Sequence, residues 1–116
     1  MKRLVLYPLQ QLHALVSDLA VEQLRFEAGA ACFSVVNRGA MDVSDVGVAV
    51  VVNDRYGGHR YLRLPWLAAG ASEQFSVPLD LPAGGHRIEV IADPERQILE
   101  AEALQADNRA VLEVQR

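Results

Sequence analysis

The sequence predicts an all-β fold: a seven-stranded antiparallel β-sandwich that follows a short N-terminal arm. From residue 18 onward, apolar residues alternate with polar or small ones in short segments, which is the pattern of half-buried strands. Gly, Pro, Asn and Asp residues separate these segments at short, regular spacing, as in sandwiches. No segment after residue 18 has the length and periodicity of a long helix. We therefore expect one domain at residues 18–116, preceded by an apolar arm at residues 1–17.

The first strand is expected at residues 18–27, where the alternation changes parity near Glu22-Gln23. A parity change inside a strand indicates a β-bulge or a strand that switches sheets. Ala28-Gly29 then turns the chain into a second strand, which ends at Asn37-Arg38-Gly39 because Asn and Gly tolerate positive φ. One face of this second strand carries Ala31, Phe33 and Val35.

The clearest strand is expected at residues 45–53, where a valine stripe lies opposite small residues such as Gly47 and Ala49. This pattern indicates a central strand. Residues 53–58 are expected to form a hairpin loop, and residues 59–67 its partner strand. Pro65 indicates that the partner strand lies at a sheet edge or ends there, since Pro cannot donate a ladder hydrogen bond. The valine stripe is Val46, Val48, Val50 and Val52.

Three more strands complete the predicted sandwich. The fifth carries Phe75, Val77 and Leu79, and Pro78 again indicates an edge position. A turn at residues 82–85 leads to a sixth strand at residues 86–92, and the last strand is expected at residues 109–115. Between these two, residues 95–106 are expected to form a loop with a short turn.

Composition excludes several partner classes. The net charge is −4, from 15 acidic against 11 basic residues, which argues against a nucleic-acid partner because phosphate binding needs a basic face. No run approaches the roughly 18 apolar residues of a membrane helix, so no membrane span is expected. The basic and then apolar start of the chain resembles a signal peptide, but polar residues interrupt it, and we expect a retained arm.

The arm at residues 1–17 is more apolar than an isolated sandwich requires. Leu4 and Leu6 suit an extended strand. Such a strand could pair with its own sheet edge, or with the edge of a neighbouring copy as a donor strand. It could also be the remnant of a preceding domain, and the sequence does not separate these three alternatives. Leu4 and Leu6 are therefore candidate contact residues.

A series of short motifs occurs in order along the chain: Asp18-Leu19, Val35-Val36-Asn37-Arg38-Gly39, Leu67-Ala68-Ala69-Gly70-Ala71-Ser72, Ala83-Gly84-Gly85-His86-Arg87-Ile88, Ala92-Asp93-Pro94, Ile98-Leu99-Glu100 and Asp107-Asn108. From Asp18 to Val114 they resemble the CARDB domain, a bacterial and archaeal module related to cell adhesion. Gln105 and Asp107 depart from the Glu and Asn that the family usually has there. The resemblance implies an immunoglobulin-like or fibronectin-III-like sandwich that occurs as repeats in exported or surface proteins.

The resemblance also implies a non-catalytic structural or adhesive module, extracellular or at the cell surface, whose partners are other proteins or further copies of itself. On the predicted edge strand, Tyr61 and Arg63 are candidate binding residues. Trp66 and Arg60 on the same strand could join them in a recognition patch. However, a single Trp in a sandwich is usually buried, so we expect Trp66 in the core.

Acidic residues gather between residues 93 and 107, and Asp93, Glu100 and Asp107 are candidate calcium ligands because hard cations take clustered carboxylate oxygens. The spacing lacks the regular alternate oxygens of an EF-hand. We therefore expect Asp93-Pro94 to set a turn and Asp107-Asn108 to cap it. The alternative function is an accessory module that binds carbohydrate or calcium through loops 53–58 and 93–107, with no other cofactor.

The sequence contains no catalytic constellation, so no enzyme is expected. His13, His59 and His86 are scattered singly, and one cysteine cannot complete a zinc set. No Ser lies in a nucleophile elbow, which leaves a triad assembled from distant loops as the enzymatic alternative. The single cysteine, Cys32, can form no intrachain disulfide, and we expect it to be a small residue in or near the core.

Overall fold

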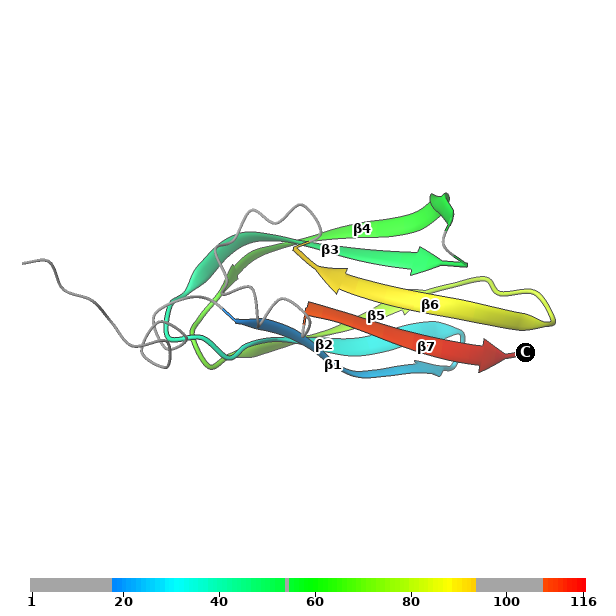
Figure 1. The fold of residues 1–116 in the computed structure, drawn as a ribbon, viewed down its shortest axis with the longest axis horizontal. Coiled ribbons are helices and arrows are strands. Elements are labelled where there is room, and N and C mark those ends of the chain that lie inside the picture. Colours follow the sequence, from blue (N-terminus) through cyan, green and yellow to red (C-terminus); the bar gives the residue numbers. More distant parts are fainter. Residues whose placement is uncertain (1–17, 54, 94–107) are drawn as a thin grey trace, which may run out of the picture.

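The computed structural model describes residues 18–53, 55–93 and 108–116, which form a two-layer antiparallel β-sandwich (Figure 1). One sheet has the strand order β1-β2-β5, with β1 at Leu19–Glu27, β2 at Ala30–Asn37 and β5 at Ser72–Pro78. The other has the order β4-β3-β6-β7, with β3 at Val43–Val52, β4 at Arg55–Leu67, β6 at Gly85–Ala92 and β7 at Arg109–Gln115. The predicted seven-stranded all-β sandwich is confirmed.

The core lies between the two sheets and contains the predicted stripes. Val46, Val48 and Val50 of β3 are fully buried and belong to one apolar cluster with residues of β1, β2 and β6. The ring of Phe33 on β2 stacks on that of Phe75 on β5, with centroids 5.3 Å apart. Each such side chain contributes about 1.5–3 kcal/mol when it is fully buried.

The predicted irregularity in β1 is a β-bulge. The pairing of β1 with β2 shifts register between Glu22 and Arg25, and Gln23 adopts a φ of 57°. The extra residue restores the inward direction of Leu24 and Phe26, which pack against the core. It also places Arg25 directly across from Cys32 on β2.

The predicted hairpin loop at residues 53–58 is wrong in extent. β4 begins at Arg55, so Gly57 and Gly58 lie inside the strand. The pairing of β3 with β4 shifts register between Val50 and Val52. Glycine inside a strand often accommodates a bulge. Gly57 and Gly58 therefore belong to the irregular part of β4 and not to a loop. Of the described residues between the two strands, Asn53 forms the turn.

The two proline predictions are confirmed, because β4 and β5 are edge strands of the described sheets. Cys32 lies outside the core. It is half-buried on the outer face of β2, with its Sγ 3.8 Å from the Oγ of Ser76 on β5. Alternation explains this position, since its neighbours Ala31 and Phe33 face inward.

Asn37 ties the end of β2 to two other segments. Its side chain is fully buried, and Nδ2 donates to the carbonyls of Met41 at 2.8 Å and Leu67 at 3.1 Å. Its Oδ1 accepts from the Gly39 backbone N–H at 3.0 Å. Asn37 does not adopt positive φ, so its role is to hold the end of β4 through these bonds.

Across residues 18–53, 55–93 and 108–116, no helix has the length and apolar character of a membrane span.

Candidate protein-contact surface

The two lateral edges of the sandwich differ. At one edge β1 and β7 run close together (Figure 1), and the Arg116 guanidinium lies over the Phe26 ring, 5.1 Å from its centroid. At the other edge lie β4 and β5, and β4 exposes Tyr61 by 42% and Trp66 by 59%. We call this side the β4–β5 edge. Among the described strands, β4 and β5 each have a neighbour on one side only.

The prediction that Trp66 is a core residue is wrong. Leu64 and Leu67 are both buried although they are three residues apart, so the inward face of β4 changes parity between them. Opposite this point, Asp45 of β3 has a φ of 57° and stands across from Pro65 without pairing. Since Pro65 has no N–H to donate, the ladder is interrupted here, and the local twist directs Trp66 outward.

The two predicted binding residues of β4 lie side by side. The Arg63 guanidinium lies over the Tyr61 ring, 5.6 Å from its centroid, and its Nε pairs with an Asp45 carboxylate oxygen at 3.3 Å. Exposed contacts of this kind contribute at most about 1 kcal/mol each. Their effect is to hold the guanidinium in one orientation beside the aromatic ring.

Tyr61 also covers the outer face of the neighbouring strand β3. A Cβ on Gly47 would meet the hydroxyl oxygen and Cζ of Tyr61, so the ring can keep its present position only beside a glycine. The small residues that the sequence showed opposite the valine stripe therefore have a definite function: they accept a side chain from β4.

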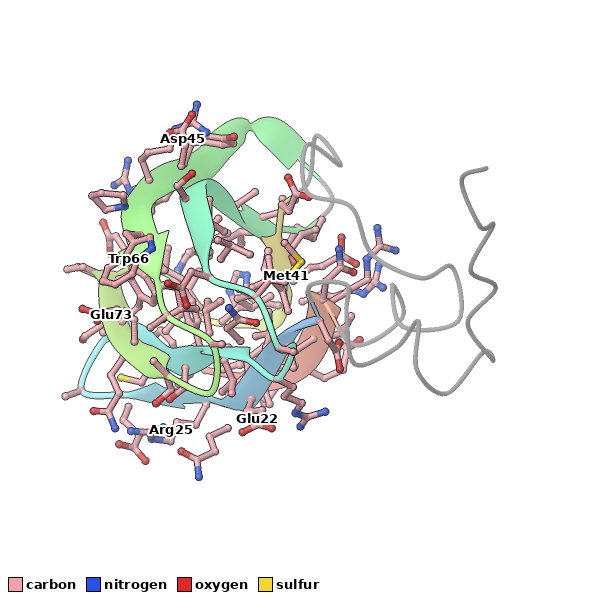
Figure 2. The ribbon with its side chains drawn as sticks, turned by 90° about the vertical axis from the view of Figure 1, so that its left-hand side faces the viewer. Glu22, Arg25, Met41, Asp45, Trp66 and Glu73 are labelled. Atoms are coloured by element: carbon pink, nitrogen blue, oxygen red, sulfur yellow. The ribbon has the colours of Figure 1, made fainter. Side chains whose placement is uncertain are left out.

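Trp66 projects from the side of the sandwich, with Asp45 above it and Glu73 below it (Figure 2). We define the β4 patch as Tyr61, Arg63 and Trp66. Trp, Tyr and Arg are the residue types most enriched among the dominant residues of protein interfaces. Arg60 is also exposed on this strand, whereas Leu4 and Leu6 lie outside the described residues.

Asp93 is the one candidate calcium ligand that the structure describes; Glu100 and Asp107 lie outside the described residues. Asp93 is 3% exposed, has a φ of 53°, and donates its backbone N–H to the Gly47 carbonyl at 2.6 Å. Nearby, Asn108 Nδ2 donates to the Ala92 carbonyl at 2.9 Å and joins the two ends of the acidic segment. Within the described part of the chain, no three His, Cys, Asp or Glu side chains are placed to hold a metal ion.

His86 has a structural position. Its Nε2 lies 2.7 Å from the Pro82 carbonyl and must donate to it, so in neutral imidazole Nδ1 accepts from Asn53 Nδ2 at 3.1 Å. Asn53 Oδ1 in turn accepts from the Arg87 backbone N–H at 2.8 Å. Nδ1 therefore joins β6 to Asn53 at the end of β3, and Nε2 holds the turn that precedes β6. The side chains of His13 and His59 lie outside the described part.

The CARDB family model matches residues 19–110. The chain belongs to the CARDB family. This is a family of modules related to cell adhesion, so the match accounts for the fold and for the general class of the protein. No curated protein matches this CARDB domain.

Solved structures have the same fold. The CARDB domain of a Pyrococcus furiosus protein, determined in solution, matches with a TM-score of 0.70 and 22% identity, over 87% of this chain and 95% of that chain. A domain of a candidate cell surface protein from Methanosarcina acetivorans matches with a TM-score of 0.69 and 18% identity, over 87% and 92%. The crystal structure of the Pyrococcus domain in complex with di-metal ions matches with a TM-score of 0.62 and 22% identity, over 86% and 88%.

Two residues of the β4 patch, Tyr61 and Arg63, lie on an edge strand as predicted, whereas the third, Trp66, does not lie in the core. Tyr61 and Arg63 share the parity opposite to Leu62 and Leu64, and that signal was sufficient for them. Trp66 is expected in the core because a single Trp in a sandwich is usually buried, and this expectation is wrong. The signals that could have corrected it are Pro65 and the polar pair Ser44-Asp45 on the partner strand, which together permit a break in the alternation.

Proposed function

We propose that this CARDB domain is a non-catalytic structural or adhesive module that acts through protein–protein contacts at the cell surface or outside the cell. The observation that carries the proposal is Trp66, 59% exposed on an edge strand. Beside it, the Arg63–Tyr61 pair adds a fixed guanidinium and a second aromatic ring. Burying such a patch against another protein would remove apolar surface from water and retain a directed cation.

The partner we propose is a second copy of the same chain. The arm at residues 1–17 is the second contact element, with Leu4 and Leu6 as its apolar anchors. An extended arm can add a strand to an exposed sheet edge, where backbone hydrogen bonds supply affinity and side-chain contacts supply specificity. The segment of β4 from Arg60 to Leu64 contains no proline and can accept such a strand.

The test is the solution mass by light scattering over a range of protein concentrations. We expect the full chain to be oligomeric, and both the chain lacking residues 1–16 and the Trp66→Ala variant to shift toward the monomer. Val111→Ala is the matched control, since Val111 is 44% exposed on the opposite edge strand β7. Trp66 is the only tryptophan, so its fluorescence emission should move to shorter wavelength as copies associate.

Two results would contradict this proposal. A monomer at every concentration would exclude self-assembly and direct the search to a different protein partner. An oligomer that survives both Trp66→Ala and Arg63→Glu, but dissociates in Val111→Ala, would place the interface at the β1–β7 side instead.

A second candidate is cation binding by the acidic segment at residues 93–107, with Asp93, Glu100 and Asp107 as the candidate ligands. The related Pyrococcus domain, which has been crystallised with di-metal ions, favours this candidate. Calcium at about 100 times its Kd would stabilise the fold by about 2.7 kcal/mol. Thermal melts with and without calcium test it, with Asp93→Asn as the variant because Asn tolerates the positive φ at this position. An unchanged melting temperature would remove the candidate.

A further inference from the structure

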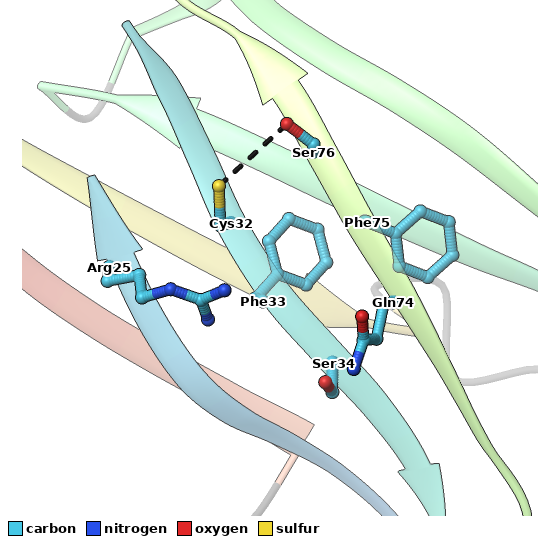
Figure 3. A pocket seen from close by; sticks show the side chains of 7 residues that line it. All are labelled: Arg25, Cys32, Phe33, Ser34, Gln74, Phe75 and Ser76. Atoms are coloured by element: carbon cyan, nitrogen blue, oxygen red, sulfur yellow. Dashed lines mark hydrogen bonds between the residues drawn. The ribbon is translucent and has the colours of Figure 1, made fainter. Parts of the chain in front are cut away.

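A groove of about 290 Å³ opens on the outer face of the β1-β2-β5 sheet (Figure 3). Two sets of cross-strand neighbours on β1, β2 and β5 line it, Arg25–Cys32–Ser76 and Ser34–Gln74. The central strand β2 contributes the small side chains Cys32 and Ser34, whereas β1 and β5 contribute the longer Arg25 and Gln74. Small residues between long ones leave a depression along the middle of the sheet.

Ser34 points to a ligand. The residue is 8% exposed and lines the groove, yet no described residue makes a hydrogen bond to its hydroxyl. Its Oγ is not among the buried side-chain atoms that lack a partner, so the hydroxyl is accessible from the groove and offers a donor and an acceptor to a ligand there. The Gln74 amide beside it on β5 also lacks a hydrogen-bond partner among the described residues.

Arg25 supplies a positive charge in the other set of neighbours. Its Nη1 donates to the Gln23 carbonyl at 3.0 Å, and its Nε pairs with Glu27 at 3.1 Å. These contacts orient the guanidinium, which extends from β1 toward β2 (Figure 3). No described residue pairs with Nη2, so Nη2 can still donate hydrogen bonds to the carboxylate of a ligand.

Cys32 lies in the same groove and is the only cysteine of the chain. Its thiol is half-buried, with Sγ 3.8 Å from both Ser76 Oγ and the Ala30 carbonyl oxygen. A disulfide needs Cα atoms about 4.4–6.8 Å apart, whereas sheets that pack face to face lie about 10 Å apart. Cys32 residues of two copies packed sheet on sheet would therefore be too far apart to form a disulfide, whereas a small molecule can enter the groove.

We propose that this groove binds a small zwitterionic disulfide of the amino-acid type and that Cys32 exchanges with it. The ligand carboxylate pairs with Arg25, and its polar groups bond to Ser34 and Gln74. The Cys32 thiolate attacks one sulfur of R–S–S–R; the Cys32 Sγ–S bond forms as the R–S–S–R bond breaks, and RS⁻ leaves with the electron pair and takes up a proton from water. Cys32 is oxidised to a mixed disulfide while the small disulfide is reduced, so no other oxidant is needed.

The test is intact mass spectrometry of the full chain during incubation with cystine, compared with the uncharged hydroxyethyl disulfide. The same two reactions on the urea-unfolded chain give the intrinsic preference of the thiol between the two reagents. We expect the folded chain to gain one cysteinyl group, and to prefer cystine about tenfold more strongly than the unfolded chain does. Cys32→Ser should gain none.

Variants then show which groove residues cause the preference for cystine. Arg25→Gln should remove most of the preference for cystine, and Ser34→Ala with Gln74→Ala should reduce it several-fold. Glu73→Ala is the matched control, since Glu73 precedes Gln74 on β5 but does not line the groove. Equal preference in the folded and unfolded chains, or a folded thiol that reacts with neither reagent, would overturn the proposal.

Discussion

The central strands β2 and β3 both carry small residues on their outward faces, but the two faces differ in how those residues are covered. On β3, the Tyr61 ring lies over Gly47. On β2, Cys32 and Ser34 form the floor of an open groove. The same local pattern therefore leads to a closed face on one sheet and to a candidate site on the other.

The neighbouring strands cause this difference. The edge strand β4 supplies an aromatic ring, which is stabilised when it covers apolar surface. The neighbours of β2 supply Arg25 and Gln74, whose polar ends remain in water while their stems line the groove. Cys32 and Ser34 therefore line an open groove, because the flanking side chains are too polar to cover them, whereas Gly47 is covered by an aromatic ring.

The largest effect should come from the inward side of β2. Phe33→Ala should lower the free energy of unfolding by about 3–5 kcal/mol, because Phe33 is 1% exposed and stacks on Phe75. Ser34→Ala, one residue away on the groove side, should change it by less than about 0.5 kcal/mol. Urea denaturation of both variants measures the contrast, and a cost above about 2 kcal/mol at Ser34 would show that the groove side is also part of the packed core.

Gly47→Ala should reopen the covered face. The added Cβ would meet the Tyr61 ring. We therefore expect overpacking to lower the free energy of unfolding by about 1–3 kcal/mol. In a Tyr61→Ala background the same substitution should stabilise the protein by about 0.5–1 kcal/mol, since Gly inside a strand is unfavourable. The double-mutant cycle is measured by chemical denaturation, and additive effects would contradict the contact.

Trp66→Ala should lower the free energy of unfolding by about 1 kcal/mol or less, because most of this side chain is already exposed to water. Leu64→Ala, two residues earlier on the same strand, should cost about 2–5 kcal/mol because Leu64 is 7% exposed. Thermal or urea melts of the two variants give the comparison. Equal losses would mean that Trp66 is packed in the core, as expected for a single Trp in a sandwich.

Ser34→Val should change the free energy of unfolding least, and should raise it instead of lowering it. The groove has room for the added methyl groups, an unpartnered hydroxyl is removed, and Val suits a strand better than Ser. We expect stabilisation by about 0.5 kcal/mol in urea melts. A destabilisation as large as that of Gly47→Ala would mean that the face over β2 is closed too.

Features that depend on neighbouring residues in the chain were predictable. The stripe Val46, Val48 and Val50 became the core side of β3, and the parity change near Glu22-Gln23 became a bulge. Pro65 and Pro78 marked edge strands. In each case the physical cause acts along the chain: side chains alternate with period two, and proline lacks an N–H wherever it stands.

Features that depend on pairing were not predictable. Gly57-Gly58 has the composition of a turn, but the register of β3 against β4 places it inside a strand. Trp66 follows the alternation of Leu62 and Leu64, but an irregular Asp45 on the partner strand interrupts that alternation. Pro65 permits a break in the alternation before Trp66, but whether the break occurs depends on the facing strand.

The sequence by itself determined the fold class, the number and order of the strands, and the membership of the CARDB family, since alternation, turn residues and motif order are all properties of the linear chain. Only the tertiary structure decided that Trp66 is exposed, that Tyr61 covers Gly47, and that Cys32 and Ser34 share an open groove with Arg25 and Gln74. The reason is that cross-strand register brings together residues up to tens of positions apart, and register is settled by packing of the whole sandwich.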